Sequence, residues 1–154
     1  MTYLKNSRSR LVVWAILALA SSTGLAQDAP QPRLPTVELT AGMHVIRAEL
    51  AQTPAQQSMG LMFRTRMEPN EGMLFADPQP GIRCFWMRNT LLPLTIAFLA
   101  DDGTIVNTAD MKPMDETSHC SKAPVRFALE MNQGWFAKRG LKAGARIRGG
   151  PFGR

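Results

Sequence analysis

Phe85-Trp86-Met87-Arg88-Asn89-Thr90-Leu91-Leu92-Pro93-Leu94 is the most informative stretch of the chain. An apolar run ends in this stretch, and a second one, residues 94–100, begins at its last residue. Between the two runs lie large apolar side chains, a guanidinium and an amide that donate hydrogen bonds, and a hydroxyl that can cap a turn. The stretch therefore predicts a corner that joins two core strands and carries hydrogen-bonding side chains.

Short strands are predicted on both sides of this corner. Strand-like runs occupy residues 37–39, 43–51, 73–75, 82–87, 94–100, 104–111 and 125–131, with a last one around Ile147. Residues 78–81 and 101–103 are typical of turns, and Asp102-Gly103 is typical of a tight hairpin. In residues 125–131, apolar positions alternate with Arg126 and Glu130, which predicts that Glu130 faces outward.

Residues 53–66 are the best helix candidate. Thr53 suits the N-cap, Pro54 the first helical position, and Gln56 completes a capping box. An apolar stripe recurs at helical spacing and consists of Ala55, Met59, Met62 and Phe63. Many short strands with one amphipathic helix predict a compact α+β domain, built on a mainly antiparallel curved sheet or partial barrel.

The N-terminus has the three-part pattern of an export signal. Lys5, Arg8 and Arg10 precede an apolar run at 11–20, and small residues lead to Ala26. The run is shorter than the roughly 20 residues that span a bilayer. We therefore expect a signal peptide at 1–26, a periplasmic or secreted chain, and membrane attachment only if the signal stays uncleaved.

The chain beyond the predicted cleavage site is long enough for one domain. Its 128 residues carry a formal charge of +3, because three of the 18 basic residues lie in the signal. Residues 27–35 contain three prolines and predict an extended leader, and residues 36–150 are expected to form one domain. Export also argues against a nucleic-acid partner.

Cys84 and Cys120 are the only two cysteines. An even pair in an exported protein suggests a disulfide, but two buried free thiols fit the sequence equally well. One bridge would close a loop of about 36 residues. A single bridge cannot replace a hydrophobic core, so the domain must still fold around apolar side chains.

Several motifs occur in one order and together resemble a known family. They are Gly60-Leu61-Met62-Phe63-Arg64, Gly72-Met73-Leu74-Phe75, residues 85–90 with Pro93-Leu94, Ile96-Ala97-Phe98, Asp102-Gly103-Thr104-Ile105, residues 111–113, and Leu129-Glu130 with Gly134. Over roughly residues 37–147 the chain closely resembles the bacterial and archaeal domain-of-unknown-function family 192. The resemblance implies a small, mainly β domain with one helix, commonly exported or membrane-tethered, and no established activity, substrate or cofactor.

The chain departs from this family at one position after Pro93-Leu94. The family usually has an acidic residue there, whereas this chain has Thr95. Any role that depends on that carboxylate is therefore in doubt for this protein.

Ligand-binding candidates gather around the corner. They are Trp86, Met87, Arg88, Asn89 and Thr90, with Asp102 and Glu130. An arginine fork matches carboxylate or phosphate, and beside an exposed tryptophan face it could hold a sugar or an anionic group. The structural alternative is that Trp86 fills the core, Asn89 satisfies turn backbone, and Arg88 pairs with Glu130 or Asp102.

Two further chemistries remain as alternatives. A Cu(I) site could use Met111, Met114, His119 and Cys120, because soft ligands select this ion. A hydrolase acting on envelope carbohydrate could draw a carboxylate pair from Asp101, Asp102, Asp115, Glu116 and Glu130. The sequence contains no nucleophile elbow, zinc-protease motif, Cys-x-x-Cys or phosphate-binding glycine loop. We therefore expect a binding module without a cofactor, whose partner is a cell-envelope polymer or another exported protein.

Overall fold

A curved sheet of seven strands dominates the computed structural model, which describes residues 28–152. The predicted signal peptide, 1–26, lies outside the described residues. The strands run in the order β6-β5-β8-β3-β2-β1-β9, and a two-stranded sheet pairs β4 with β7. Their bounds are β1 Thr36–Ala41, β2 His44–Ala51, β3 Glu71–Gly81, β4 Cys84–Phe85, β5 Leu94–Leu99, β6 Ile105–Met111, β7 His119–Cys120, β8 Val125–Asn132 and β9 Ile147–Gly149.

Hydrogen bonds near the C-terminus join the two ends of this sheet. Strand β9 pairs with β1, and the residues before it bond to the β5–β6 hairpin. The amide of Ile105 donates to the carbonyl of Ala145 (2.8 Å), and that of Ile147 donates to Gly103 (2.9 Å). The sheet is therefore a half-barrel, as the prediction of a partial barrel anticipated, and the protein is mostly β rather than a balanced α+β domain.

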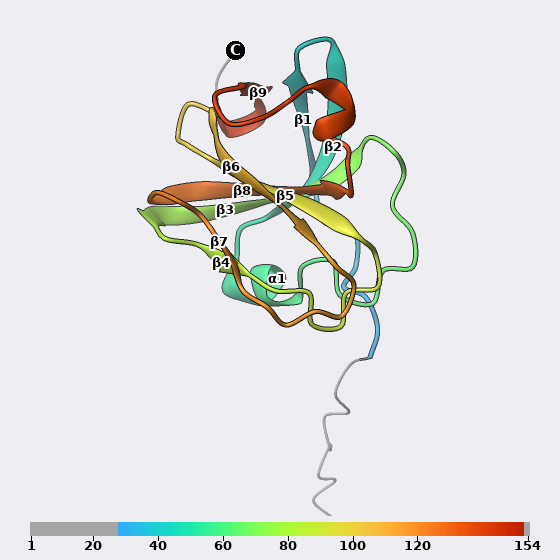
Figure 1. The fold of residues 1–154 in the computed structure, drawn as a ribbon. Helices are drawn as coiled ribbons and strands as arrows, with labels where there is room; N and C mark the ends of the chain where they lie inside the picture. Colours follow the sequence, from blue (N-terminus) through green and yellow to red (C-terminus); the bar gives the residue numbers. More distant parts are fainter. Residues whose placement is uncertain (1–27, 153–154) are drawn as a thin grey trace, which may run out of the picture.

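Apolar side chains pack on both faces of the sheet. One core contains Leu74, Leu129 and Phe136 and lies toward the C-terminal segment with its short 3-10 helices, η1 (Ala137–Arg139) and η2 (Gly150–Phe152). The other contains Phe75 and Phe98 and lies under α1 (Pro54–Met59) and the β4–β7 pair. Figure 1 shows α1, β4 and β7 together on this side of the central strands. Strands β3, β5 and β8 are therefore covered on both faces.

The predicted outward orientation of Glu130 is wrong for this reason. Strand β8 is buried on both sides, with Leu129 fully buried and Glu130 only 4% exposed. Alternation separates a core face from a solvated face only where one side of the sheet meets water. Here a second layer covers the side on which Glu130 lies.

Helix α1 is much shorter than the predicted 53–66. The capping box is present, because Thr53 Oγ1 accepts from the amide of Gln56 and the Gln56 side chain accepts from the Thr53 amide. The helix ends at Gly60, whose φ of 47° is unfavourable for residues with a side chain. A Cβ at Gly60 would lie 3.3 Å from the ring of Phe75, so the turn packs closely on β3.

In the middle of the chain, the strands of the structure have other bounds than the predicted strands. Strand β3 extends to Gly81 and includes residues 78–81, which the sequence predicts as a turn; its pairing with β8 is irregular there. Of the predicted strand 82–87, only Cys84 and Phe85 pair, and their partners in β7 lie between the predicted strands 104–111 and 125–131. The hairpin at 101–103 is confirmed, and the strands predicted at 94–100 and 104–111 are present as 94–99 and 105–111.

The leader is attached to the domain rather than free of it. The Gln31 side-chain amide donates to the carbonyls of Gln56 (3.1 Å) and Gly60 (2.8 Å). It thereby supplies a hydrogen-bond donor to carbonyl groups at the C-terminal end of α1. The amide of Leu34 donates to Glu49 Oε2 at 2.8 Å, and Arg64 pairs with the same buried carboxylate at 3.0 Å. The leader therefore holds α1 in place over the sheet.

Gly103→Ala is expected to destabilise the protein by about 2 kcal/mol more than Gly140→Ala. Both glycines have positive φ, so both substitutions strain the backbone. A Cβ at Gly103 would clash with the carbonyl oxygen of Ile147, whereas one at Gly140 meets nothing within 4 Å. Urea unfolding of both variants measures the difference, and equal losses would show that the contact between hairpin and β9 is loose.

Candidate functional site

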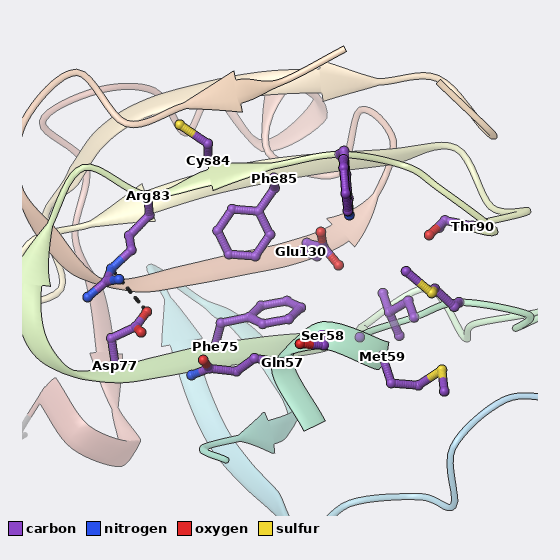
Figure 2. Close-up of a pocket in the computed structure, with 14 residues that line it drawn as sticks. Gln57, Ser58, Met59, Phe75, Asp77, Arg83, Cys84, Phe85, Thr90 and Glu130 are labelled. Carbon is purple, nitrogen blue, oxygen red and sulfur yellow. Dashed lines mark ion pairs between the residues drawn. The ribbon is translucent and has the colours of Figure 1, made fainter. Parts of the chain in front are cut away.

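A cavity of about 380 Å³ lies between α1 and the β4 corner. Figure 2 shows Glu130 in the middle of this cavity, with Phe75 and Phe85 on one side and Thr90 on the other. The lining comes from four parts of the chain, namely α1 and the turn after it, β3, the segment from Arg83 through β4 to the corner, and β8. The lining residues are Gln57, Ser58, Met59, Gly60, Leu61, Met62, Phe75, Asp77, Arg83, Cys84, Phe85, Trp86, Thr90 and Glu130.

Glu130 has the most unusual environment in the cavity. It lies on β8, opposite Met73 of β3 and Ile96 of β5, and is 4% exposed. Among residues 28–152 no hydrogen bond or charged group acts on its carboxyl group, which lines the cavity. Burial alone raises the pKa of Glu130 to about 8, because an unpaired charge is poorly solvated there. Near neutral pH the folded protein therefore holds this group mostly as a neutral acid.

Aromatic rings form one side of the cavity. Phe75 of β3 and Phe85 of β4 meet edge to face, with ring centroids 4.8 Å apart, and Phe85 also packs on Phe98. Trp86 lines the same cavity and remains 49% exposed. A ligand in the cavity would therefore contact both buried rings and a ring that faces solvent.

One charged pair lies at the edge of the cavity. Arg83 Nε is 3.2 Å from Asp77 Oδ2, and both residues line the cavity. Figure 2 shows this pair at one end, with Glu130 further along. The pair balances its own charge, so Glu130 is the only uncompensated titratable group of the lining.

A disulfide holds the aromatic side in position. Cys84 and Cys120 are bonded, and they face each other in the two-residue pairing of β4 with β7. The sequence left a bridge and two free thiols equally open, and the structure has the bridge. Because Phe85 follows Cys84 directly, the bridge keeps the Phe85 ring against Phe75.

The structure separates the residues predicted at the corner. Trp86, Thr90 and Glu130 line the cavity. Met87 is completely buried in the core under α1, so it is a structural residue. Arg88 is exposed, and in the described part of the chain it forms neither of the ion pairs suggested for it, with Glu130 or with Asp102.

Asn89 and Asp102 stabilise turns outside the cavity lining. Asn89 has φ of 54°, a conformation that asparagine tolerates, and its carbonyl accepts from the amide of Phe63 at 2.8 Å. Asp102 lies in the β5–β6 hairpin, where it accepts from the amide of Thr104 and pairs with Arg146 at 3.0 Å. Neither residue can contribute to binding in this cavity without a change of structure.

The residues of the copper alternative do not form a thiolate site. Cys120 is bonded to Cys84, so its sulfur is not a thiolate in this structure. Met111 is fully buried in the core, whereas Met114 is 55% exposed. Within residues 28–152, no three His, Cys, Asp or Glu side chains gather where they could share a metal ion.

Thr95, the departure from the family pattern, does not line this cavity. Its hydroxyl donates to Asp110 Oδ1 and accepts from the amide of Gly134 at 2.9 Å. It lies beside a separate hollow formed with β6 and η1. The absence of a carboxylate at this position therefore leaves the Glu130 cavity unchanged.

Several cavity residues were missed at the level of sequence. Phe75 and Phe85 occur in the quoted motifs, but nothing in the pattern distinguishes a ring in a cavity wall from a ring in the core. Asp77 and Arg83 were missed because their pairing depends on the path of β3 through residues 78–81. Gln57 and Ser58 lie on the helix, where polar residues usually face solvent.

None of the helices in the described residues is long and apolar enough to cross a membrane.

Comparison with known proteins identifies an uncharacterised family and two similar solved structures. The model of DUF192, described as "Uncharacterized ACR", matches residues 37–149. One is a crystal structure from Sinorhizobium meliloti 1021, described as a proposed transcription regulator, whose sequence is 37% identical to this chain. The match covers 74% of this chain and 92% of the other chain, with a TM-score of 0.69. The other is a protein of unknown function from Novosphingobium aromaticivorans, which is 38% identical in sequence. The match covers 82% of this chain and 98% of the other chain, also with a TM-score of 0.69. No curated protein matches the chain.

Proposed function

The chain belongs to the DUF192 family, and from its cavity we propose that it is an exported binding module that holds a group of a cell-envelope component. The proposal assigns binding rather than a reaction to the Glu130 cavity. The observation that carries it is the combination of aromatic walls with one buried, unpartnered carboxyl group. Ligand sites are typically concave and largely apolar, with a small number of polar groups that orient the ligand.

The charged groups of the cavity favour binding over hydrolysis. A glycoside hydrolase of the common type needs two carboxyl groups that act together on one bond. Of the two carboxyl groups in the lining, Asp77 is paired with Arg83, and only Glu130 is free. A single neutral carboxyl group can donate or accept a hydrogen bond, which suits recognition of a ligand.

Two features support an exported location. The N-terminal sequence has the pattern of an export signal. The disulfide between Cys84 and Cys120 is of a kind that persists in oxidising compartments such as the periplasm and is rare in the cytosol. An exported protein meets the polymers of the cell envelope as its most abundant potential ligands.

The size of the cavity favours an envelope polymer over a protein partner. Sites for small molecules typically have volumes of about 300–1,000 Å³, and this cavity of about 380 Å³ is large enough for one small group. The exposed ring of Trp86 offers a flat apolar face on which a sugar ring can lie. We therefore expect the bound group to be a sugar or peptide unit of an envelope polymer.

Trp86→Ala is expected to weaken retention on purified peptidoglycan sacculi about tenfold, which corresponds to about 1.4 kcal/mol. The side chain is half exposed, so its removal should cost less stability than the loss of a fully buried ring. Leu91→Ala is the matched control, because Leu91 is similarly exposed at 46% but does not line the cavity. Co-sedimentation at several protein concentrations gives the apparent affinity of each variant. Equal retention of all three proteins, or none by the original protein, would contradict the proposal.

A further inference from the structure

Glu130 is a buried acid that the protein leaves without a partner. Its side chain lies on β8 near the centre of the sheet, is 4% exposed, and still borders the cavity. Buried carboxyl groups are normally paired or hydrogen-bonded, because an isolated charge in a poorly solvated site is strongly unfavourable. A group of this kind, aimed into a cavity, is complementary to a ligand that supplies the missing charge.

The neighbouring charged groups are already engaged. In the cavity, Asp77 and Arg83 pair with each other. On the same strand as Asp77, Glu71 is paired with Arg33, at a distance of 3.2 Å between Oε2 and Nη1. After α1, Arg64 is bound to Glu49. No side-chain cation of the described residues is therefore placed to neutralise an ionised Glu130.

The aromatic lining suits a cation as well. The faces of Phe and Trp rings carry partial negative charge and attract ammonium groups within about 6 Å of the ring centre. Phe75, Phe85 and Trp86 line the same cavity as Glu130. An anionic ligand would be repelled by an ionised Glu130, and a neutral ligand would leave Glu130 protonated as in the free protein, so only a cation gains an ion pair there.

We propose that the cavity recognises a primary ammonium group carried on a small ring or chain, with the Glu130 carboxylate as its counter-ion and the three rings as its walls. This inference rests on the proposed binding function and names the chemistry of the ligand. In an envelope polymer, such a group would be a free amine of a sugar or of a peptide side chain. Because the free protein holds Glu130 as an acid near neutral pH, binding releases its proton to solvent.

The affinity for an ammonium ligand should therefore rise with pH. Below the pKa of Glu130, the ligand must displace a proton, and each unit of pH costs up to tenfold in affinity. Above about pH 8 the carboxylate is already present and the dependence ends. Asp77 and Arg83 are the only other titratable groups of the lining, and they form an ion pair with each other.

Isothermal titration with benzylamine and with benzyl alcohol, its neutral counterpart, tests this inference at pH 6 and pH 8. Benzylamine stays protonated at both values. We expect benzylamine to bind at least tenfold more tightly at pH 8 than at pH 6, with proton release, whereas benzyl alcohol changes little. In Glu130→Gln the affinity for benzylamine at pH 8 should fall at least tenfold and lose its pH dependence.

Asp102→Asn is the matched control, because it makes the same carboxyl-to-amide change at an exposed position outside the cavity lining. It should bind benzylamine as the original protein does. Equal affinity for benzylamine and benzyl alcohol, no binding of benzylamine at pH 8, or an unchanged Glu130→Gln variant would overturn the ammonium inference. None of these results would affect retention on sacculi through Trp86, so the binding function is judged separately.

Discussion

Glu130→Gln is expected to make the protein more stable at alkaline pH, by about 4 kcal/mol at pH 9 relative to pH 5. Burial raises the pKa of Glu130 from 4.5 to about 8 in the folded state. Between these values the folded protein keeps a proton that the unfolded chain releases, so the free energy of unfolding falls by about 1.4 kcal/mol per pH unit. The stability contribution is complete below about pH 4.5 and is lost as pH rises to 8. Glutamine stays neutral and removes this loss.

Urea unfolding of both proteins at pH 5, 7 and 9 measures this difference directly. Near pH 5 the two proteins should be similar in stability, because glutamine has nearly the shape of the protonated acid. Asp102→Asn serves as the control, since the hydrogen bond from the Thr104 amide lowers the pKa of Asp102 and its titration lies below this range. If Glu130→Gln followed the same pH curve as the original protein, Glu130 would not be an unpaired buried acid.

A group that weakens the fold at neutral pH needs a reason to be present. Proteins that violate a packing rule tend to do so at functional sites, where local stability is given up for binding or chemistry. A leucine or glutamine at position 130 would suit the sheet better than an unpartnered acid. The instability expected from Glu130 therefore supports its assignment to a ligand site.

Removal of the disulfide is expected to cause the second large change in stability. The Cys84→Ala/Cys120→Ala protein is expected to lose about 3–4 kcal/mol of stability, because the bridge closes a 36-residue loop that would otherwise be free in the unfolded chain. The pairing of β4 with β7 covers only two residues in each strand, and a few hydrogen bonds of flanking residues, such as that from the Ser121 amide to the Arg83 carbonyl, join the same two segments. The Phe85 ring should then become mobile, and the affinity for benzylamine should fall with the stability.

Thermal and urea unfolding, with and without dithiothreitol, measure this effect. Reduction should lower the stability of the original protein to nearly that of the double variant and leave the double variant unchanged. Binding of benzylamine at pH 8, followed below the unfolding transition, separates the loosened cavity from global unfolding. If the double variant lost less than about 1 kcal/mol of stability, the hydrogen bonds and the packing of Phe85 on Phe75 would be enough to hold β4 and β7 in place without the bridge.

The strands were predictable where the sequence pattern and the environment agree. The run from Leu94 to Leu99 is apolar except for Thr95, and the structure buries all of it in β5. Asp102-Gly103 predicted the hairpin between β5 and β6 correctly, because few residues other than glycine adopt the conformation that Gly103 has. The family resemblance over most of the chain was also confirmed.

The helix and β3 were predicted less well, for identifiable reasons. The apolar stripe that suggested a helix over 53–66 continues past Gly60, yet the chain turns there and lays Leu61 into the core. Residues 78–81 have the composition of a turn, but they form the last part of β3. In both cases contacts with distant parts of the chain outweigh a local preference.

The site was predictable in part. The sequence singled out Trp86, Thr90 and Glu130, which line the cavity, but it grouped them with Arg88 and Asp102, which do not. Neighbours along the chain point in different directions at a corner, so a motif cannot show which of its side chains share a cavity. The burial of Glu130 could not be foreseen because it depends on the second layer formed by α1 and β4–β7.

The titration of the Glu130 carboxyl group, followed by its ¹³C chemical shift with and without benzylamine, tests the central claim most directly. We expect a midpoint near pH 8 in the free protein, as is typical of an unpaired buried acid. Saturating benzylamine should lower this midpoint by at least one unit, because the ammonium group stabilises the carboxylate. A midpoint close to the ordinary value of 4.5, unchanged by benzylamine, would contradict both the burial of the acid and its role in the cavity.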